Sequence, residues 1–293
     1  MSTDTTAPSP PTKKAGITLD GGVALITGAG SGIGKDTEFA FTAASASAVV
    51  FADIDLAAAE RAAEESKTHA ASPDEFKALA VCVDVTKDES VEAMVKKTVK
   101  EFGRVDYLVN SAGVKNNSKA AIYHTKLDVF QQAMDINATG TLRCIRAVTN
   151  VMREQTPRSY TGRNRMRDVG KGCVVNIASV FSNIAMPRTV SYVASKHAVM
   201  GITRAAAPSS ASPILRHITL AASPYMRLAS VDEVSEYIVF LCSPFASYIN
   251  GTGLTIDAGA SCNMMTSNLT PDQLKMLPEV VAMHNSSPQV QLR

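Results

Sequence analysis

The fold of this chain is decided by residues 27–34, which read Thr27-Gly28-Ala29-Gly30-Ser31-Gly32-Ile33-Gly34. An apolar run at 23–27 precedes this glycine-rich stretch, and a helical pattern at 32–44 follows it. In the order strand, glycine turn and helix, the helix N-terminus presents free N–H groups and a positive dipole to an anion. The stretch therefore predicts a phosphate-binding turn.

Three glycines of the turn have separate physical roles. Gly28 allows the tight turn off the strand, because glycine adopts backbone conformations that other residues disfavour. Gly32 lets the backbone approach a pyrophosphate without a Cβ in the way, and Gly34 permits close packing of helix on strand. Taken alone, the octet also fits a glycine-rich turn without a ligand. Its place between a strand and a helix favours a dinucleotide-binding turn.

An acidic residue follows at the spacing expected for such a turn. Asp53 ends the second apolar run, nineteen residues beyond Gly34. A carboxylate there accepts hydrogen bonds from the adenosine ribose and repels a 2′-phosphate. Ser31 stands where a basic residue would welcome that phosphate, and Lys35 lies just inside the helix. The sequence predicts NAD as the cofactor, with NADP less favoured. Asp53 also suits a helix-capping role.

Short apolar runs alternate with longer amphipathic stretches outward from this turn. Five runs rich in Val, Ile or Ala predict strands buried on both faces of a parallel sheet, at residues 23–27, 48–52, 78–83, 105–110 and 173–178. Helices are expected near residues 32–44, 55–70, 88–102, 127–153 and 191–206. This alternation predicts an α/β fold, a single-domain Rossmann-like doubly wound parallel sheet.

The remaining segments fit around that one domain. We predict a disordered tail at residues 1–16, the nucleotide-binding domain at 17–265 and a C-terminal tail at 266–293. Residues 153–171 are polar and basic and predict a surface loop rather than a phosphate site. Residues 237–256 carry no charge and match the length of a membrane span. Their proline and glycines favour a helix, a turn and a buried strand instead.

Composition excludes several classes of protein. The chain is 45% hydrophobic and 19% charged, which fits a globular fold and argues against a disordered or fibrous one. A net charge of +2 gives no electrostatic case for nucleic acid or a membrane surface as a partner. The five cysteines form no CxxC pair, so neither a disulfide framework nor a metal site is expected. The first twenty residues lack a signal-peptide core, and we expect a cytoplasmic protein.

A second motif suggests chemistry. Tyr192 and Lys196 are four residues apart in a predicted helix and therefore share one face. A tyrosine pKa of about 10 is too high for an efficient base near neutrality, and a neighbouring ammonium favours the phenolate. Ser179 follows a predicted strand, at the sheet edge where ligands bind. Alone, the pair also fits an ordinary helix surface. Together with the glycine turn, it favours a catalytic site.

On these motifs the chain resembles the short-chain dehydrogenase/reductase family, in the branch with TGxxxGIG and YxxxK, over about residues 20–205 and 226–262. The family's NNAG motif reads Asn110-Ser111-Ala112-Gly113 here, with Ser111 in place of an Asn. The resemblance implies a set of cofactor-binding residues: Thr27, Gly28, Ser31, Gly32, Ile33, Gly34, Asp53, Asp84, Val85, Asn110, Ala112, Gly113, Tyr192 and Lys196. It implies a catalytic set as well: Asn137, Ser179, Tyr192 and Lys196.

The resemblance also implies a role for each catalytic residue. Tyr192 would exchange a proton with the substrate oxygen, and Ser179 would hydrogen-bond that oxygen. Lys196 would bind the nicotinamide ribose and lower the pKa of Tyr192, and Asn137 would hold a water molecule in the proton relay. The implied reaction is hydride transfer between NAD(P) and a small molecule, interconverting a secondary alcohol and a ketone. The mostly apolar residues 180–187 indicate that this molecule is hydrophobic. A homodimer or homotetramer is expected through the helices at 127–153 and 191–206.

The chain departs from the family pattern after Lys196. Pro208 and Pro213 stop the helix, residues 214–222 suit a sixth strand, and no Pro-Gly follows. The substrate-lid segment over 207–230 is therefore predicted to be shortened, either in the protein itself or through an error in the gene model. A protein without the lid would have an open site. This leaves the alternative of a non-catalytic or weakly active relative that binds dinucleotide or a partner subunit. A methyltransferase is not favoured, because it would not need Tyr192 and Lys196 at this spacing.

Overall fold

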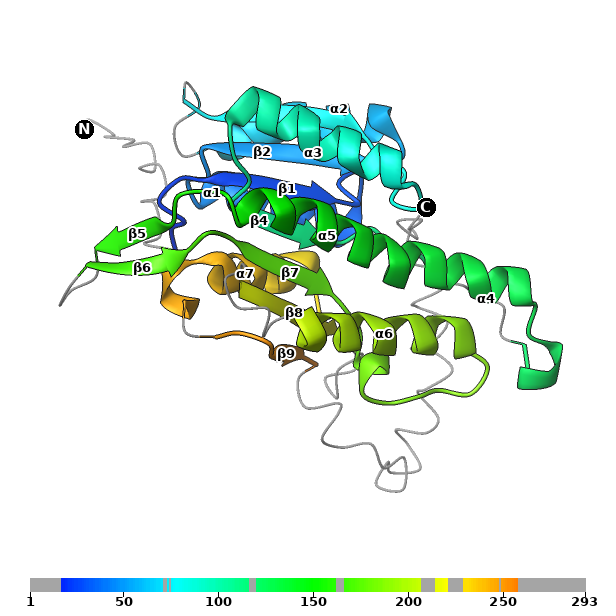
Figure 1. Ribbon diagram of the computed structural model, residues 1–293. Coiled ribbons are helices and arrows are strands. Elements are labelled where there is room, and N and C mark those ends of the chain that lie inside the picture. The colour runs from blue at the N-terminus through cyan, green and yellow to red at the C-terminus, as the bar shows by residue number, and fades with distance from the viewer. Residues whose placement is uncertain are drawn as a thin grey trace, which may run out of the picture.

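One parallel sheet of seven strands forms the centre of the protein (Figure 1). The computed structural model describes residues 17–70, 73, 75–115, 120–161, 166–206, 214–220, 229–247 and 249–257. In spatial order the strands are β3 (Lys77–Cys82), β2 (Ala48–Asp53), β1 (Val23–Thr27), β4 (Tyr107–Asn110), β7 (Cys173–Ile177), β8 (Ile214–Leu220) and β9 (Gly253–Ile256). All neighbouring strands pair in parallel. Their carboxyl ends therefore lie along one edge of the sheet.

Helices cover both faces of this sheet (Figure 1). On one face lie α1 (Gly32–Ala43), α2 (Leu56–Ser66) and α7 (Val231–Cys242), and on the other lie α3 (Asp88–Phe102), α5 (Thr141–Met152) and α6 (Val190–Ala206). The strand side chains supply both layers, because successive residues of a strand point to opposite faces. In β1, Ala24 and Ile26 join one core, and Leu25 joins the other. The predicted single-domain doubly wound sheet is confirmed.

Two strands differ from the expectation of burial on both faces. In β3 only Val81 is fully buried, because β3 is the edge strand of the sheet. The expected buried strand at the end of residues 237–256 is β9, which forms the opposite edge and has alternating exposed and half-buried residues. The sixth strand is confirmed: β8 lies between β7 and β9.

The predicted helix at 127–153 is interrupted. Its first part is α4 (Leu127–Ala133), a π-helical segment follows as η3 (Met134–Gly140), and α5 completes it. A π turn holds one residue more than an α turn and is frequent at functional sites. The hydrophobic pattern of the sequence could not distinguish a π-helical turn from an α-helical one. The predicted helix at 55–70 ends at Ser66 and continues as the short η1 (Lys67–His69).

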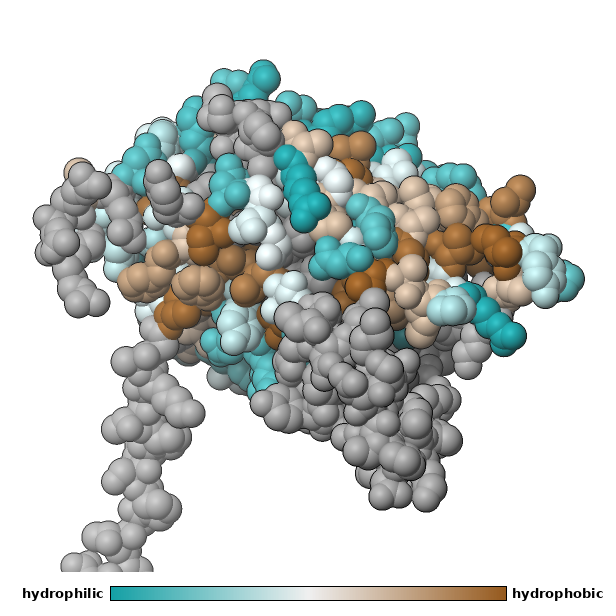
Figure 2. Space-filling view, turned by 90° about the horizontal axis from the view of Figure 1, so that it is seen from below, coloured by the Kyte–Doolittle hydropathy of each residue, from teal (hydrophilic) through white to brown (hydrophobic). Residues whose placement is uncertain are grey.

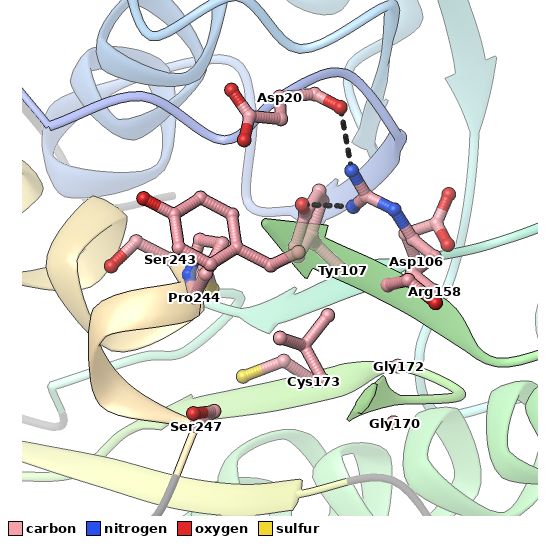
Figure 3. Close-up of a pocket in the computed structure, with 14 residues that line it drawn as sticks. Asp20, Asp106, Tyr107, Arg158, Gly170, Gly172, Cys173, Ser243, Pro244 and Ser247 are labelled. Atoms are coloured by element: carbon pink, nitrogen blue, oxygen red, sulfur yellow. Dashed lines mark hydrogen bonds between the residues drawn. The ribbon is translucent and has the colours of Figure 1, made fainter. Parts of the chain in front are cut away.

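The basic segment at 153–171 forms a hairpin rather than a loop. Its strands are β5 (Arg158–Thr161) and β6 (Met166–Gly170), which project beyond the sheet in Figure 1. The Arg158 guanidinium donates to the carbonyl oxygens of Leu19 at 3.0 Å and Asp20 at 2.7 Å and also contacts the Tyr107 hydroxyl. Figure 3 shows the contacts of Arg158 with Asp20 and Tyr107 in a small pocket at the amino ends of the strands. Arg158 therefore fastens the hairpin to the domain.

Several expectations concern residues outside the described ranges. They are the tails at 1–16 and 266–293, Cys262, and most of the expected lid region, 207–213 and 221–228. Within the described ranges, the uncharged segment at 237–256 comprises the end of α7, the short η5 (Pro244–Ala246) and β9. None of the described helices has the length and apolar character needed to cross a bilayer.

Glu38 in α1 gives a stability prediction. Its side chain is fully buried, and neither carboxylate oxygen has a hydrogen-bond partner among the described residues. Burial, with the nearby Asp53 carboxylate, raises the pKa of Glu38 well above its ordinary value, and Lys35 only partly opposes this. Above the unfolded-state pKa of about 4.3, the unfolded chain releases the Glu38 proton while the folded state keeps it. The free energy of unfolding should therefore fall as pH rises from this value towards the higher pKa of the folded state.

Glu38→Gln should remove this dependence, because the amide cannot ionise. The free energy of unfolding of the variant, relative to the native protein, should rise by about 1.4 kcal/mol per pH unit while folded Glu38 keeps its proton. Urea titrations at acidic, neutral and mildly alkaline pH measure this difference. A difference that stays constant with pH would show that Glu38 does not titrate between the two states.

Candidate active site

The glycine turn after β1 has the backbone that an anion site requires. Gly28 and Gly32 have φ angles of 74° and 56°, in the left-handed region that favours glycine. A Cβ on Gly28 would lie 2.8 Å from the Ala112 backbone nitrogen, so only glycine fits there. Ser31 is the N-cap of α1 without a side-chain cap bond, and the first turn holds no acidic residue. The first N–H groups of α1, from Gly32 onward, are therefore not capped by Ser31.

The last glycine of the turn is held by close backbone packing. A Cβ on Gly34 would overlap the carbonyl oxygen of Gly28. The Thr27 hydroxyl accepts a hydrogen bond from the Ala112 N–H at 3.3 Å, which joins the end of β1 to the loop after β4. The turn is therefore fixed from both sides.

Asp53 closes the turn on the β2 side. Its Oδ2 accepts a hydrogen bond from the Gly30 N–H at 2.8 Å, and its Oδ1 accepts one from the Asp55 N–H at 2.9 Å. Asp55, not Asp53, is the N-cap of α2, since its carboxylate accepts from the Ala58 N–H at 3.0 Å. The capping role considered for Asp53 therefore belongs to Asp55. Asp53 stands beside the glycine turn, where a ribose is expected.

The nearest lysine to this position is already paired. Lys35 Nζ lies 2.6 Å from Glu65 Oε2 on α2 and 5.3 Å from the centre of the Phe39 ring. Its charge is partly neutralised by the carboxylate. Lys35 is therefore poorly placed to bind the 2′-phosphate of NADP near Asp53.

The segments after β3 and β4 complete this half of the site. Burial acts to raise the pKa of Asp84, but hydrogen bonds from Thr86 together with the charges of Lys87 and Arg143 outweigh it, and the pKa lies below its ordinary value. Val85 packs against the π segment: a Cβ on Gly140 would meet its Cγ2 at 2.9 Å. Asn110, buried at the end of β4, donates to Asn176 Oδ1 on β7 at 2.8 Å.

A second group of side chains surrounds Lys196 on α6. Its buried ammonium donates to the Ile177 carbonyl oxygen, at the end of β7, at 2.7 Å. The same nitrogen lies 5.7 Å from the centre of the Tyr192 ring, and 3.8 Å from the place of a Cβ on Gly113. Burial lowers the pKa of Lys196 to about 8. Lys196 thus joins α6 to the end of β7 and lies close to Gly113 in the loop after β4.

Tyr192 and Ser179 form the centre of this group. Burial raises the pKa of Tyr192, and a side-chain hydrogen bond with Ser179 partly lowers it again. In the protein without cofactor, the group that lowers the pKa of Tyr192 against the effect of burial is therefore Ser179. The sequence had indicated Lys196 for this role. The reason is geometric: the Lys196 ammonium is held by the Ile177 carbonyl rather than by the phenol oxygen. The Ser179 oxygen also accepts a bond from the Phe181 N–H at 3.3 Å.

Asn137 lies in the π-helical segment and is buried. Its Oδ1 accepts from the Val114 N–H at 2.8 Å, and its Nδ2 donates to the Val114 carbonyl at 2.9 Å and to Ser195 Oγ at 3.0 Å. The Ser195 hydroxyl in turn donates to the Tyr192 carbonyl at 2.9 Å. The Asn137 side chain therefore ties the loop after Gly113 to the helix that carries Tyr192.

Two serines of this network were missed in the sequence. Ser195 lies within the Tyr-x-x-x-Lys motif itself, and its spacing from Tyr192 was the available signal. Ser182 follows Ser179 at the Ser-x-x-Ser spacing of a helix N-terminal capping box, and the structure shows that box. Both make long-range contacts that spacing alone cannot reveal.

The structure brings all the predicted site residues to the carboxyl edge of the sheet or onto the helices beside it, in two adjoining groups. The glycine turn and Asp53 fit a dinucleotide, because Gly28 and Gly32 hold left-handed backbone at an uncapped helix start. Gly113 joins this cradle to the group around Lys196 and Asn137. The arrangement suits a proton exchange beside a bound nicotinamide.

Comparisons with known proteins agree with this geometry. The family model described as short chain dehydrogenase matches residues 22–223, and the one described as enoyl-(acyl carrier protein) reductase matches residues 209–261. The chain is 37% identical to the short-chain dehydrogenase anuF of Penicillium roqueforti, over 84% of this chain and 98% of that protein. It is 32% identical to the 2-(R)-hydroxypropyl-CoM dehydrogenase of Xanthobacter autotrophicus, over 80% and 96%.

A solved structure shows the same fold. The crystal structure of 3-ketoacyl-(acyl-carrier-protein) reductase from Brucella melitensis, complexed with NADH, superposes with a TM-score of 0.70 at 30% identity. The match covers 82% of this chain and 98% of that one. With its fold, its site geometry and these matches, the chain belongs to the short-chain dehydrogenase/reductase family, oxidoreductases that act on CH–OH groups with NAD(P).

Proposed function

We propose that the protein interconverts a secondary alcohol and a ketone on a small hydrophobic molecule, with NAD(H) as the hydride carrier. The observation that carries this proposal is the position of Lys196. Its ammonium donates to the Ile177 carbonyl oxygen at the end of β7, faces the Cα of Gly113, where an added Cβ would lie 3.8 Å away, and lies 5.7 Å from the centre of the Tyr192 ring. The proton-exchanging group and the nicotinamide side of the cradle therefore adjoin. No observation among the described residues favours the alternative of a relative without activity.

Tyr192 is the proposed acid and base. When bound, the dinucleotide supplies or accepts the hydride. During ketone reduction the Tyr192 hydroxyl gives its proton to the carbonyl oxygen, and during alcohol oxidation the phenolate takes it back. Ser179 would hydrogen-bond the same oxygen: its own oxygen accepts from the Phe181 N–H, and the O–H that bonds Tyr192 in the protein alone would turn to the substrate oxygen.

Lys196 and Asn137 arrange this pair. Lys196, protonated below a pKa of about 8, would bind the nicotinamide ribose of a bound dinucleotide. Asn137 uses its side chain to hold Val114 and Ser195, and so fixes the loop and the helix to each other. Its proposed part in the reaction is the one predicted from the sequence, to hold a water molecule of the proton relay.

The wall beside Tyr192 supports a hydrophobic substrate. The Phe181 ring meets the Tyr192 ring edge-on, with centroids 6.1 Å apart and an interplanar angle of 86°. An aromatic wall favours apolar groups next to the reacting carbon. A panel of aliphatic, alicyclic and aromatic ketones with NADH tests the proposal. Oxidation of NADH that depends on the ketone supports it, and NADH binding without turnover of any ketone would contradict it.

The Asp53 carboxylate is the proposed reason for a preference for NAD over NADP. Asp53→Asn keeps the shape but removes the charge that repels a 2′-phosphate. The ratio of NADPH to NADH dissociation constants should fall by about tenfold to a hundredfold. Fluorescence titration of both cofactors measures it. Asp55→Asn is the matched control, because asparagine caps a helix as well as aspartate does and the ratio should not move. A native protein that binds NADPH more tightly than NADH would refute the proposed preference for NAD.

We also propose a cytoplasmic homo-oligomer, paired through α4, α5 and α6. Leu127 on α4 and Leu142 on α5 are 79% and 46% exposed, although both are apolar. Figure 2 shows apolar side chains gathered towards the end of the molecule that carries α4. Light scattering on the purified protein measures its mass in solution, and a monomer would contradict this part of the proposal.

A further inference from the structure

Ser182 is a fully buried serine three residues after Ser179, in the short η4 (Val180–Ser182). Its hydroxyl donates to the carbonyl oxygen of Lys196 at 2.7 Å and accepts the N–H of Ser179 at 3.3 Å. A single hydroxyl thus joins the backbones of two residues of the proposed catalytic set. Those residues lie on different elements, the turn after β7 and the helix α6.

The direction of these bonds sets the position of Ser179. The N–H of Ser182 donates to the Ser179 carbonyl at 2.8 Å, so the turn is held from both ends. The Ser179 side chain caps the same turn through the Phe181 N–H. With its backbone N–H and its hydroxyl oxygen both engaged, Ser179 has little freedom to change rotamer or to move from α6.

The contact that depends on this position is the one between Ser179 and Tyr192. Burial raises the pKa of Tyr192, and the hydrogen bond from the Ser179 side chain lowers it in part. Among the described residues no other hydrogen bond joins the Ser179 turn to the Lys196 backbone, and Phe181 of this turn also packs edge-on against the Tyr192 ring of α6. If the Ser182 hydroxyl is removed, the turn can shift relative to α6, while the Lys196 ammonium keeps its own bond to Ile177.

We propose that Ser182 is a positioning residue, which sets the place of the Ser179 hydroxyl against Tyr192 by joining the Ser179 and Lys196 backbones. This inference rests on the proposed function for its kinetic part only. Ser182 does not touch the substrate in this arrangement, since it is fully buried behind the turn. Its effect passes through Ser179 to the acidity of the Tyr192 phenol.

Ser182→Ala tests the proposal, with Ser66→Ala as the matched control. Ser66 on α2 is an equally buried serine whose hydroxyl donates to a helix carbonyl, that of Ala63, at 2.7 Å. Both variants lose one buried hydroxyl, but only one loses it at the site. Ser182→Thr keeps the hydroxyl and is the conservative variant for rescue.

The first readout needs no substrate. Fluorine NMR of protein labelled with fluorotyrosine follows the ionisation of each phenol with pH, and the Tyr192 resonance is assigned by its loss in Tyr192→Phe. Ser182→Ala should move the Tyr192 midpoint upward by about half a pH unit, because the bond that lowers it is weakened. Ser66→Ala should leave it in place, and Ser182→Thr should return it towards the native value.

The second readout is kinetic. With a ketone that the native protein reduces, Ser182→Ala should lower kcat by about tenfold and leave the NADH dissociation constant within about twofold. The proposal would be overturned if Ser182→Ala only lowered the melting temperature, left the Tyr192 midpoint in place and had the same kcat as Ser66→Ala. Ser182 would then be a structural residue. A moved midpoint in a protein that reduces no ketone would uphold Ser182 and refute the proposed function. An unmoved midpoint without turnover would refute both.

Discussion

Tyr192→Phe should lower kcat for ketone reduction by about 10²–10⁴-fold, the usual contribution of a general acid. Phenylalanine keeps the ring that packs edge-on against Phe181, but it has no proton to give. The Lys196 ammonium keeps its bond to the Ile177 carbonyl, so the dissociation constant of NADH should change little. Steady-state kinetics and a fluorescence titration of NADH measure the two quantities separately.

The direction of the pH dependence follows from the same residue. Burial raises the pKa of Tyr192, so the protonated phenol that reduction requires is present throughout the neutral range. Alcohol oxidation requires the phenolate, and its rate should therefore rise with pH above neutrality. Tyr160→Phe is the control, because Tyr160 lies on β5 beside Phe245, in the pocket at the opposite edge of the sheet. A Tyr192→Phe variant with native kcat would remove Tyr192 from the mechanism.

Gly34→Ala should weaken NADH binding by about a hundredfold or more. The added Cβ would overlap the Gly28 carbonyl oxygen, so the turn and the start of α1 must move apart. This backbone contact cannot relax as a flexible side chain would, and overpacking of this kind also costs about 1–3 kcal/mol of stability. Fluorescence titration gives the affinity, and a urea titration gives the stability.

Gly201→Ala is the matched control for this substitution. Gly201 lies inside α6, and a Cβ there would meet nothing within 4 Å. Alanine in a helix interior is favoured over glycine by about 0.5–1 kcal/mol, so this variant should be more stable and bind NADH normally. Native affinity in Gly34→Ala would show that the turn does not shape the cofactor site.

The sequence predicted the sheet well because its signals are local and periodic. Residues 23–27 and 88–102 were predicted with the bounds that the structure has for β1 and α3. Position within the sheet is a long-range property, so the exposure of β3 and β9 as edge strands could not be predicted. The π-helical segment around Asn137 was not predicted, because one extra residue in a helical turn barely alters a hydrophobic pattern.

The candidate site was predicted through its spaced motifs, and its supporting contacts were not. The turn at 27–34 and the pair Tyr192 and Lys196 are visible as patterns. The bond from Ser182 to the Lys196 carbonyl joins residues fourteen positions apart on different elements and has no pattern of its own. The same holds for the ion pair of Lys35 with Glu65, which affects the choice between NAD and NADP.

The proposed function depends on the transfer of a hydride between NAD(H) and a carbonyl carbon beside Tyr192. The most direct test is to supply NADH deuterated at the transferable position of the nicotinamide, with a panel of hydrophobic ketones, and to analyse the products by mass spectrometry. If this transfer occurs, the native protein should give an alcohol with deuterium on its carbinol carbon, and Tyr192→Phe should give almost none. Tight binding of NADH with no deuterium in any product, or equal labelling by Tyr192→Phe, would contradict it.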